Sequence, residues 1–378
     1  MVEKKEIVII GAGAAGVGMG VTLTELGITD FVILEKEKVG NSFANWPKET
    51  RFITPSFTSN GFGMSDLNAV AVDTSPAYTL GKERLSGTDY AEYLQLVSDE
   101  YHLPLKTGCT VKTIKKEKKN YLIETTKGTI STNYLIFAVG EFSFPAKTSI
   151  EGADRFGLHY GEVISWEEIE GEHQTIIGGN ESAIDAALEL AKLGKDVSIY
   201  TKSSGLDSRE ADPSIRLSPY TRQRFFDLHV NQKISGNIKI FTSATIRRIE
   251  KLAAEYELIT DNGESFKAEN TPILCTGFQN GVKTIATSLF EYKENGEALL
   301  NQFDESTVAK NVFLTGPSVR NGSAIFCYVY KFRQRFALIA NEIAQRNDLI
   351  VDPKKLEYYK KQSFYLDDCS DCDVTCTC

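Results

Sequence analysis

One sequence pattern occurs twice in this chain of 378 residues. Residues 6–35 contain an apolar run, a glycine-rich loop, a helix-like stretch and a second apolar run, and residues 175–202 repeat this order without a gap. Gly27 and Gly194 each lie sixteen positions after the first glycine of their loop. A strand that enters a glycine-rich turn and then a helix is typical of a dinucleotide-binding βαβ unit. The repetition therefore predicts two such units in one chain.

The first loop has all three glycines of the dinucleotide pattern. Gly11 allows the tight turn, Gly13 lets the backbone approach a pyrophosphate, and Gly16 lets the helix pack against the strand. The helix N–H groups would face the anion. This interpretation assigns the backbone around Ala14 and Ala15 to the same site.

The second loop keeps only part of the pattern. Gly178 is retained, but Asn180 stands where the second glycine would be and Ala183 where the third would be. Asparagine tolerates the left-handed backbone conformation, so we expect Asn180 to preserve the turn. Glu181 and Ser182 begin the helix that would follow.

The two copies differ at the tip of their second strand, twenty-four positions after the first glycine. Copy one has Glu35 there, and copy two has Lys202 after Thr201. A carboxylate accepts hydrogen bonds from a free adenosine ribose, whereas a cation suits a ribose with a 2′-phosphate. We therefore expect the first loop to bind FAD and the second to bind NADPH.

The duplication continues beyond the loops. Val111-Lys-Thr-Ile114, Tyr121 and Gly128 have the same spacing as Ile246-Arg-Arg-Ile249, Tyr256 and Gly263, which is typical of a β-meander. Each copy then closes on an apolar strand that ends in glycine, at Gly140 and Gly277. These patterns predict an α/β fold with two Rossmann-like domains of the three-layer ββα type, and the chain of a two-cofactor flavoprotein.

Composition narrows the function classes. The net charge of −9 and the pI near 5.2 argue against nucleic acid as a partner. No apolar run approaches the ~20 residues of a membrane-spanning helix, and residues 1–6 do not resemble a signal peptide. We expect a cytoplasmic protein without a membrane span that acts on a small-molecule substrate. A homodimer is one possible oligomeric state.

The repeats also define an expected domain organisation. The FAD domain would comprise residues 1–148 and 280–366, and the NADPH domain, residues 149–279, would be inserted into it. Residues 36–105 form an insertion that would shape the substrate side. Residues 367–378 form a cysteine-rich tail.

A third flavin-side segment is expected near residues 311–318, where an apolar strand runs into a turn at Gly316 and Ser318. A long amphipathic helix would begin near Ser323, and its N-terminus would stabilise negative charge on reduced flavin. Cys327 at the head of this helix is a candidate residue near flavin, although a buried inert thiol is the competing interpretation.

The two loops, the segment Val39-Gly40-Asn-Ser42-Phe43-Ala-Asn-Trp46-Pro47 with Arg51, and residues 220–224 resemble flavin-containing monooxygenase-type flavoproteins, in particular CzcO-like proteins. The resemblance implies NADPH-dependent reduction of FAD, followed by activation of molecular oxygen and oxygenation of a small substrate. It also implies that Gly40, Ser42 and Trp46 lie along the flavin, with Trp46 and Arg51 as candidate pocket residues. The family's usual linker signature is not met at residues 156–166.

Together these arguments give two sets of expected cofactor residues. Those for FAD are Gly11, Gly13, Ala14, Ala15, Gly16, Glu35, Lys36, Ser42, Trp46, Val111, Gly140, Gly316 and Ser318. Those for NADPH are Gly178, Asn180, Glu181, Ser182, Ala183, Thr201, Lys202 and Gly277. Arg216, Arg222 and Arg224 would either bind the NADPH phosphates or form ion pairs. No residue pattern identifies a nucleophile or a general base.

The competing enzyme class is disulfide reduction. Thioredoxin reductase-like enzymes carry a Cys-x-x-Cys pair in the nicotinamide domain, and no such pair precedes residue 369 here. The tail offers four cysteines instead, which could relay electrons to a disulfide or bind a metal ion. Its aspartates oppose thiolate formation, which favours a tail without a catalytic role. A non-enzymatic flavin-bearing partner of a transporter is the third hypothesis. The tail cysteines are Cys369, Cys372, Cys376 and Cys378.

Overall fold

The computed structural model describes residues 2–57, 63–203, 206, 208, 215–231, 233–322 and 324–367. Within these residues the chain forms two compact units. Residues 2–44, 54–141 and 280–367 make up the first unit, and residues 45–53 and 142–279 make up the second. The sequence had assigned residues 45–53 and 142–148 to the FAD domain, whereas they pack with the second unit.

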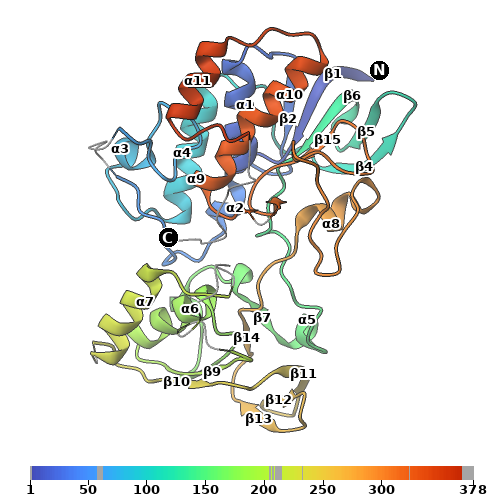
Figure 1. The fold of residues 1–378 in the computed structure, drawn as a ribbon. Coiled ribbons are helices and arrows are strands. Elements are labelled where there is room, and N and C mark those ends of the chain that lie inside the picture. Colours follow the sequence, from blue (N-terminus) through green and yellow to red (C-terminus); the bar gives the residue numbers. More distant parts are fainter. Residues whose placement is uncertain are drawn as a thin grey trace. The chain divides into compact units, whose positions relative to one another are not determined.

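The first unit is built on a seven-stranded sheet with the order β3-β2-β1-β6-β5-β4, in which β15 also pairs with β6 (Figure 1). Strands β1, β2, β3 and β15 join it in parallel, and β4 and β5 in antiparallel fashion. The strands are β1 (Glu3–Ile10), β2 (Phe31–Leu34), β3 (Leu105–Lys106), β4 (Val111–Lys116), β5 (Tyr121–Thr125), β6 (Gly128–Phe137) and β15 (Val312–Leu314).

Strand β6 serves both as the last strand of the meander and as the return strand under the nucleotide loop. Its first half pairs with β5, while residues 135–137 pair with β15, and β1 lies along its other side. No proline or glycine interrupts residues 129–137, so one continuous strand suffices. The predicted meander and return strand thus merge into a single element.

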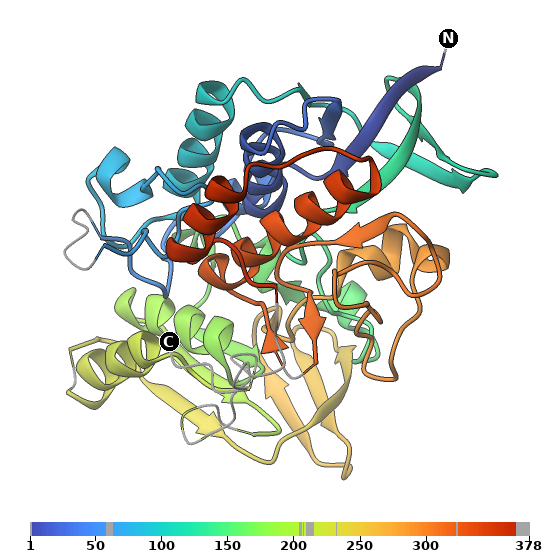
Figure 2. The same ribbon diagram turned by 45° about the horizontal axis from the view of Figure 1, so that its top comes forward.

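Helices cover this sheet and bury its apolar side chains. Helix α1 (Ala14–Glu25) is buried from Ala14 through Leu23, and it lies beside α10 (Phe336–Arg346) in both views (Figures 1 and 2). The approach is close at Gly18, where a Cβ would lie 2.3 Å from the ring of Phe336. A larger residue at Gly18 would therefore force the two helices apart.

The remaining helices of the first unit are short except for α4, which packs against α1. Ser86 begins α4 with a capping box, because its hydroxyl accepts from Asp89 N–H while the Asp89 carboxylate accepts from Ser86 N–H. These elements are α2 (Asn41–Ala44), α3 (Pro76–Leu80), α4 (Gly87–Glu100), α8 (Gly281–Ile285), the 3₁₀ turns Thr287–Leu289 and Arg333–Arg335, α9 (Val329–Phe332) and α11 (Pro353–Lys361).

The helix expected to begin near Ser323 begins later. Arg320–Asn321 (β16) and Ala324–Ile325 (β17) pair as a short antiparallel hairpin, so Ile325 belongs to a strand. Ser323 itself lies outside the described residues. Helical structure starts only at Val329, and the apolar stripe of the helix is buried from there on. The prediction extended the helical period into residues that pair as strands instead.

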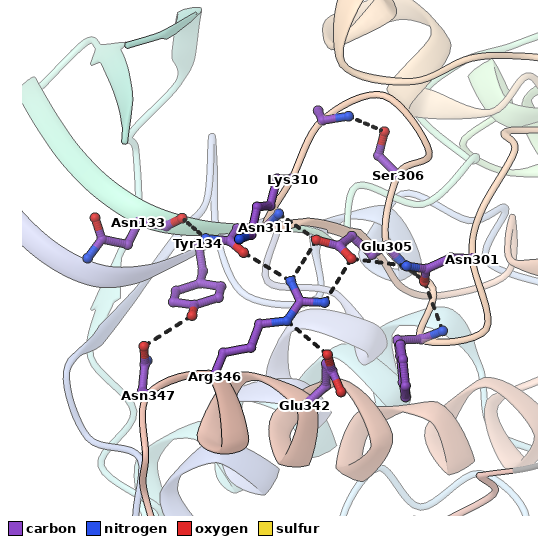
Figure 3. Close-up of polar contacts among 12 residues, drawn as sticks. Asn133, Tyr134, Asn301, Glu305, Ser306, Lys310, Asn311, Glu342, Arg346 and Asn347 are labelled. Carbon is purple, nitrogen blue, oxygen red and sulfur yellow. Dashed lines mark hydrogen bonds and ion pairs between the residues drawn. The ribbon is translucent and has the colours of Figure 1, made fainter. Parts of the chain in front are cut away.

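Polar contacts fasten the end of α10 to the sheet. Arg346 donates to both carboxylate oxygens of Glu305, at 2.7 and 2.8 Å, and to Glu342 one turn earlier on its own helix (Figure 3). Asn347 accepts from the Tyr134 hydroxyl at 3.1 Å. The two carboxylates raise the pKa of Arg346, with the hydrogen bond to Glu305 as the largest cause. A bidentate contact of this kind holds the helix end in register with β15 and β6.

The second unit contains a five-stranded sheet with the order β10-β9-β8-β14-β7, in which all neighbours are parallel (Figure 1). Its core includes Ile176, Ala187, Leu190 and Ile199. The strands are β7 (Leu158–His159), β8 (His173–Ile177), β9 (Asp196–Tyr200), β10 (Ile238–Phe241) and β14 (Ile273–Leu274), and the helical elements are α5 (Ala153–Phe156), α6 (Glu181–Lys192), α7 (Pro219–Phe225), the π turn Phe226–Val230 and the 3₁₀ turns Tyr160–Glu162 and Trp166–Glu168.

A separate three-stranded antiparallel sheet forms the second meander, from β11 (Ile246–Lys251), β12 (Tyr256–Thr260) and β13 (Ser265–Ala268). Here the meander and the return strand β14 are distinct, because residues 269–272 separate them and end in Pro272. Proline lacks the N–H group that a continuing strand needs. Each unit combines parallel strands around a glycine loop with an antiparallel meander, which confirms the predicted α/β class with two Rossmann-like units.

Candidate functional site

The first glycine loop joins β1 to α1 and leaves space only at its centre. Gly11 has a φ of +104°, and a Cβ there would lie 2.5 Å from the carbonyl oxygen of Ala138. A Cβ at Gly16 would lie 1.9 Å from the carbonyl oxygen of Gly11. At Gly13, in contrast, no heavy atom lies within 4 Å of the Cβ position. The loop is thus packed at its ends and open where a pyrophosphate would approach.

The N-terminus of α1 has no side-chain cap at Gly13, and the first hydrogen bond within the helix runs from Val17 N–H to Gly13 C=O. The N–H groups of the first turn of a helix have no partner within it. They carry the partial positive charge of the helix dipole. These groups and the space at Gly13 fit the pyrophosphate of FAD.

Glu35 is 8% exposed at the end of β2 and is held by the backbone. One carboxylate oxygen accepts from Ala12 N–H at 2.8 Å, and the other accepts from Glu37 N–H at 3.0 Å. An ionised carboxylate has about four acceptor positions. About two therefore stay available for the hydroxyl groups of a ribose.

The other residues expected at FAD all lie in the first unit except Trp46. Gly140 and Gly316 have φ values of +61° and +101°, and Gly316 faces Ala15, since a Cβ there would lie 3.2 Å from that side chain. The Ser318 hydroxyl donates to Glu141 at 2.7 Å. Lys36 lies 3.9 Å from Glu37, Ser42 belongs to α2, and Val111 begins β4.

The second glycine loop joins β8 to α6. Gly178 has a φ of +120°, and a Cβ there would lie 2.2 Å from the carbonyl oxygen of Cys275. A Cβ at Gly179 would lie 2.5 Å from the Thr201 hydroxyl. Asn180 has a φ of −109°, so the expectation of a left-handed Asn180 is wrong. Gly178, two positions earlier, takes the positive φ instead, because only glycine does so without steric cost.

The turn after β9 presents the cation of the second copy to solvent. The Thr201 hydroxyl donates to the Ser203 carbonyl at 2.5 Å, which fixes the turn around Lys202. Lys202 is exposed, and its ammonium group forms no ion pair with the residues that the structure covers. Gly277 has a φ of +82° and follows β14 on the same sheet. An exposed lysine at a strand tip fits a phosphate group.

Glu181 was expected to contact NADPH, and in the structure its carboxylate binds residues of the same unit. Its carboxylate accepts from Ser218 N–H and from the Thr221 hydroxyl, the latter at 2.6 Å. Burial raises the pKa of Glu181, while the bonds to Ser218 and Thr221 oppose that shift. Glu181 thus connects the first turn of α6 to the first turn of α7. Ser182 is half-buried, and Ala183 is buried in the core of the second unit.

Trp46 and Arg51 lie in the excursion of residues 45–53 into the second unit. The Trp46 ring packs against Phe52 and Phe142, with centroid distances of 5.0 and 6.4 Å. Arg51 donates to the carbonyl groups of Lys48 and Thr50, its near neighbours in the chain. The structure therefore gives both side chains partners within this unit.

Sequence reasoning missed a buried polar cluster that anchors the same excursion. The Thr50 hydroxyl lies 2.6 Å from the Tyr160 hydroxyl and 3.1 Å from Asp185, and Tyr160 donates to Asp185 at 2.9 Å. Glu49 accepts from the Ser165 hydroxyl at 2.5 Å. Thr50 and Glu49 lie more than one hundred positions before these partners in the sequence, so no local pattern could have revealed the cluster.

A buried histidine, His159, supports the end of the five-stranded sheet through hydrogen bonds to the backbone. His159 is fully buried, and its Nδ1 accepts from Gly161 N–H at 3.1 Å while its Nε2 lies 2.9 Å from the carbonyl oxygen of Gly277. A carbonyl oxygen can only accept, so Nε2 carries the proton and the ring is neutral. Burial lowers the pKa of His159, and the bond to Gly277 opposes that shift. His159 supports the glycine at the end of β14.

Three cysteines lie in the described part of the chain, and none of the three forms a disulfide. Cys109 is buried and Cys327 is half-buried. Burial raises the pKa of the Cys275 thiol, with nearby Asp185 adding to the effect. The tail residues Cys369, Cys372, Cys376 and Cys378 lie outside the described residues. No group of three or more His, Cys, Asp or Glu side chains suited to a metal ion occurs among the residues that are described.

No helix in the described ranges has both the length and the apolar character needed to cross a lipid bilayer.

The chain is similar to known flavoenzymes over nearly its whole length. The Bacilliredoxin reductase Bdr of Bacillus subtilis (strain 168) is 26% identical over 356 residues, which cover 92% of this chain and 100% of that protein. The structure of bacillithiol disulfide reductase Bdr (YpdA) from Staphylococcus aureus matches with a TM-score of 0.71 and 23% identity, over 91% of this chain and 99% of that one.

A flavin-containing monooxygenase from Stenotrophomonas maltophilia has the same fold, with a TM-score of 0.69 and 15% identity over 92% of this chain and 100% of that chain. At this identity the likeness shows the fold alone. The model of the pyridine nucleotide-disulphide oxidoreductase family matches residues 8–316. That range contains both glycine loops, Glu35 and Lys202. The chain therefore belongs to the pyridine nucleotide-disulphide oxidoreductase family, whose members are enzymes that use FAD and NAD(P)H.

Proposed function

We propose that this flavin oxidoreductase is an NADPH-dependent disulfide reductase. The observation that carries the proposal is the end-to-end match to a bacilliredoxin reductase, which covers 100% of that protein. A solved structure named as a bacillithiol disulfide reductase supports the same class. The substrate class would be the disulfide of a small thiol or of a small redox protein. This proposal replaces oxygenation, the main expectation from the sequence, with what was its alternative.

Each unit would hold one cofactor. The loop at Gly178 and the exposed Lys202 would bind NADPH, and the loop at Gly11 with Glu35 would bind FAD. A bound FAD would accept hydride from NADPH and pass two electrons on to the disulfide. One NADPH and one proton then convert one disulfide into two thiols. The protein contributes binding and orientation, which is consistent with the absence of an evident general base in the sequence.

The route of the electrons from flavin to an outside disulfide would run through the tail. Among the described residues Cys109 is buried, and burial raises the pKa of Cys275, so neither is a good source of thiolate. Cys327 is half-buried, but no second cysteine lies near it in the sequence. Cysteines close together in the sequence occur only between residues 369 and 378, so these four are the candidates for a thiol pair. A thiol pair close in sequence can form a disulfide and pass on two electrons.

The experiment is anaerobic turnover of NADPH with a disulfide such as DTNB. We expect NADPH-dependent release of thiols, with one NADPH consumed for each disulfide reduced. Flavin that is reduced by NADPH but transfers no electrons to any disulfide would contradict the proposal. Reoxidation by oxygen in stopped flow, with a long-lived absorbing intermediate and an oxygenated product, would instead support the oxygenase interpretation, which stays a prediction from sequence resemblance.

A further inference from the structure

Two helices of the second unit meet at their N-termini beside the Gly178 loop. Helix α6 begins at Glu181, directly after this loop, and α7 begins at Pro219 with Ser218 as its N-cap. The Glu181 carboxylate accepts from both Ser218 N–H and the Thr221 hydroxyl. The first turn of α7 is therefore fixed next to the first turn of the dinucleotide helix.

The two arginines of α7 have different environments. Arg224 donates to Asp185 and to Glu189, both at 2.6 Å, and these acids lie one and two turns beyond Glu181 on the same face of α6. Two residues apart on a helix, side chains project about 200° apart. Arg222 therefore points away from the two acids that satisfy Arg224.

Two of the three guanidinium nitrogen atoms of Arg222 are shielded from solvent without an acceptor, although the residue as a whole is half-buried. These atoms are Nε and Nη2, and neither has a hydrogen-bond partner in the residues that the structure describes. Shielded N–H groups without an acceptor are unfavourable, and their presence points to an acceptor, such as an anion, that is supplied from outside the chain.

We propose that Arg222 donates to a phosphate group of the bound dinucleotide and acts together with Lys202 as a second cation of the coenzyme site. Its planar guanidinium can bind phosphate through two parallel N–H bonds, whereas the ammonium of Lys202 acts as a point charge. Glu181 is then a positioning residue, because it fixes the first turn of α7, from which Arg222 projects. The inference concerns coenzyme binding and does not depend on which electron acceptor the enzyme uses.

Binding to the oxidised flavoprotein tests the proposal without turnover. The probes are 2′,5′-ADP, which carries the 2′-phosphate of NADPH, and 5′-ADP, which carries only the pyrophosphate, with dissociation constants measured by calorimetry. In Arg222→Gln we expect about tenfold weaker binding of 2′,5′-ADP. An equal loss for 5′-ADP would assign the contact to the pyrophosphate, and a loss confined to 2′,5′-ADP would assign it to the 2′-phosphate.

Arg247→Gln is the matched control, because Arg247 is exposed on β11 of the same unit and its loss removes the same charge. Its affinity for both probes should stay within twofold of the unmodified protein. Equal affinities for both probes in Arg222→Gln and Arg247→Gln would overturn the proposal.

Thermal unfolding of the oxidised flavoprotein without added nucleotide supplies an independent readout. Replacing Arg222 with an uncharged side chain of similar length removes shielded N–H groups that have no acceptor. Arg222→Met should therefore raise the melting temperature without ligand while it abolishes much of the stabilisation by 2′,5′-ADP. A lower melting temperature with unchanged stabilisation by 2′,5′-ADP would show a structural role for Arg222 and overturn the assignment.

The positioning role of Glu181 is tested by a double-mutant cycle. If Glu181 acts through Arg222, then Glu181→Gln should weaken 2′,5′-ADP in the presence of Arg222 and have little further effect in Arg222→Gln. Losses that simply add would mean that Glu181 acts independently of Arg222, and the positioning role would then be wrong.

Discussion

At the scale of single residues, Glu35 is held by two backbone N–H groups and keeps part of its acceptor capacity for a ligand. We expect Glu35→Ala to purify paler, because FAD would lose one or two charge-assisted hydrogen bonds of ~1.5–3 kcal/mol each. The flavin-to-protein ratio after dialysis measures this loss. Glu37→Ala, which alters the exposed neighbour, is the control and should keep its flavin. Full flavin retention by Glu35→Ala would mean that the first loop is wrongly assigned.

Lys202 determines coenzyme choice in our interpretation. It is exposed at the tip of β9, so its contact with a phosphate is worth roughly 1–3 kcal/mol. NADPH should therefore be preferred over NADH by about one to two powers of ten in kcat/KM. Lys202→Glu should remove or invert this preference and leave flavin content unchanged, whereas Lys239→Glu on the exposed face of β10 should leave it intact. Equal use of both coenzymes by the unmodified protein would refute the role of Lys202.

The burial of His159 leads us to expect that the stability of the protein depends on pH. Burial lowers its pKa below the ordinary value of 6.5, so the unfolded chain binds this proton more readily than the folded one. Stability must then fall as the pH drops through 6.5, by up to about 1.4 kcal/mol per pH unit. In His159→Gln the free energy of unfolding from urea titrations should depend less steeply on pH between 7.5 and 6. An identical slope in both proteins would show that His159 does not titrate as argued.

At the scale of elements, residues 45–53 lie between two segments of the first unit in the sequence but pack with the second unit. The Thr50 hydroxyl bonds to both Tyr160 and Asp185 in a buried cluster. Thr50→Val keeps the shape but leaves those groups short of a partner, so we expect a loss of about 1–3 kcal/mol in the free energy of unfolding. Thr113→Val removes an exposed bond to Glu124 that water can replace, and it should cost much less.

A urea titration of the Thr50→Val, Tyr160→Phe and double variants gives the coupling between the two hydroxyl groups. Direct contact at 2.6 Å should give a coupling of about 0.5–3 kcal/mol. Strictly additive losses would show that segment 45–53 is held by its other contacts, such as those of Glu49 with Ser165 and Trp166.

At the scale of the whole molecule, a truncated variant that ends at Leu366 tests what the cysteine-rich tail contributes. It keeps both cofactor-binding units and lacks residues 367–378. Leu366 provides the carbonyl group that accepts from buried Arg335, so this end point keeps the packing of the C-terminal segment. We expect full flavin content and unchanged reduction of ferricyanide by NADPH, but loss of DTNB reduction, because the tail cysteines would carry the electrons. Full DTNB reduction by the shortened chain would show that the tail has no catalytic role, which is what the sequence favoured.

The sequence by itself determined the features that depend on local geometry. Gly11 and Gly178 could be assigned to tight turns, and Gly16 to close packing of the helix, because a side chain at each position collides with the backbone. This requirement is visible in one residue and its spacing. The duplicated strands, helices and meanders followed from short-range periodicity, and the opposite charges of Glu35 and Lys202 followed from their equal offsets.

Only the tertiary structure decided which distant segments meet. The packing of residues 45–53 with the second unit and the role of Glu181 as a link to α7 depend on contacts between residues that lie far apart in the sequence. The same holds for the two shielded nitrogen atoms of Arg222, which find no acceptor among the described residues. The residues next to a side chain in the sequence do not reveal whether its partner in the fold is an acid, a helix end or a ligand. Burial and the direction of the side chain choose among these partners, and both arise only when the whole chain has folded.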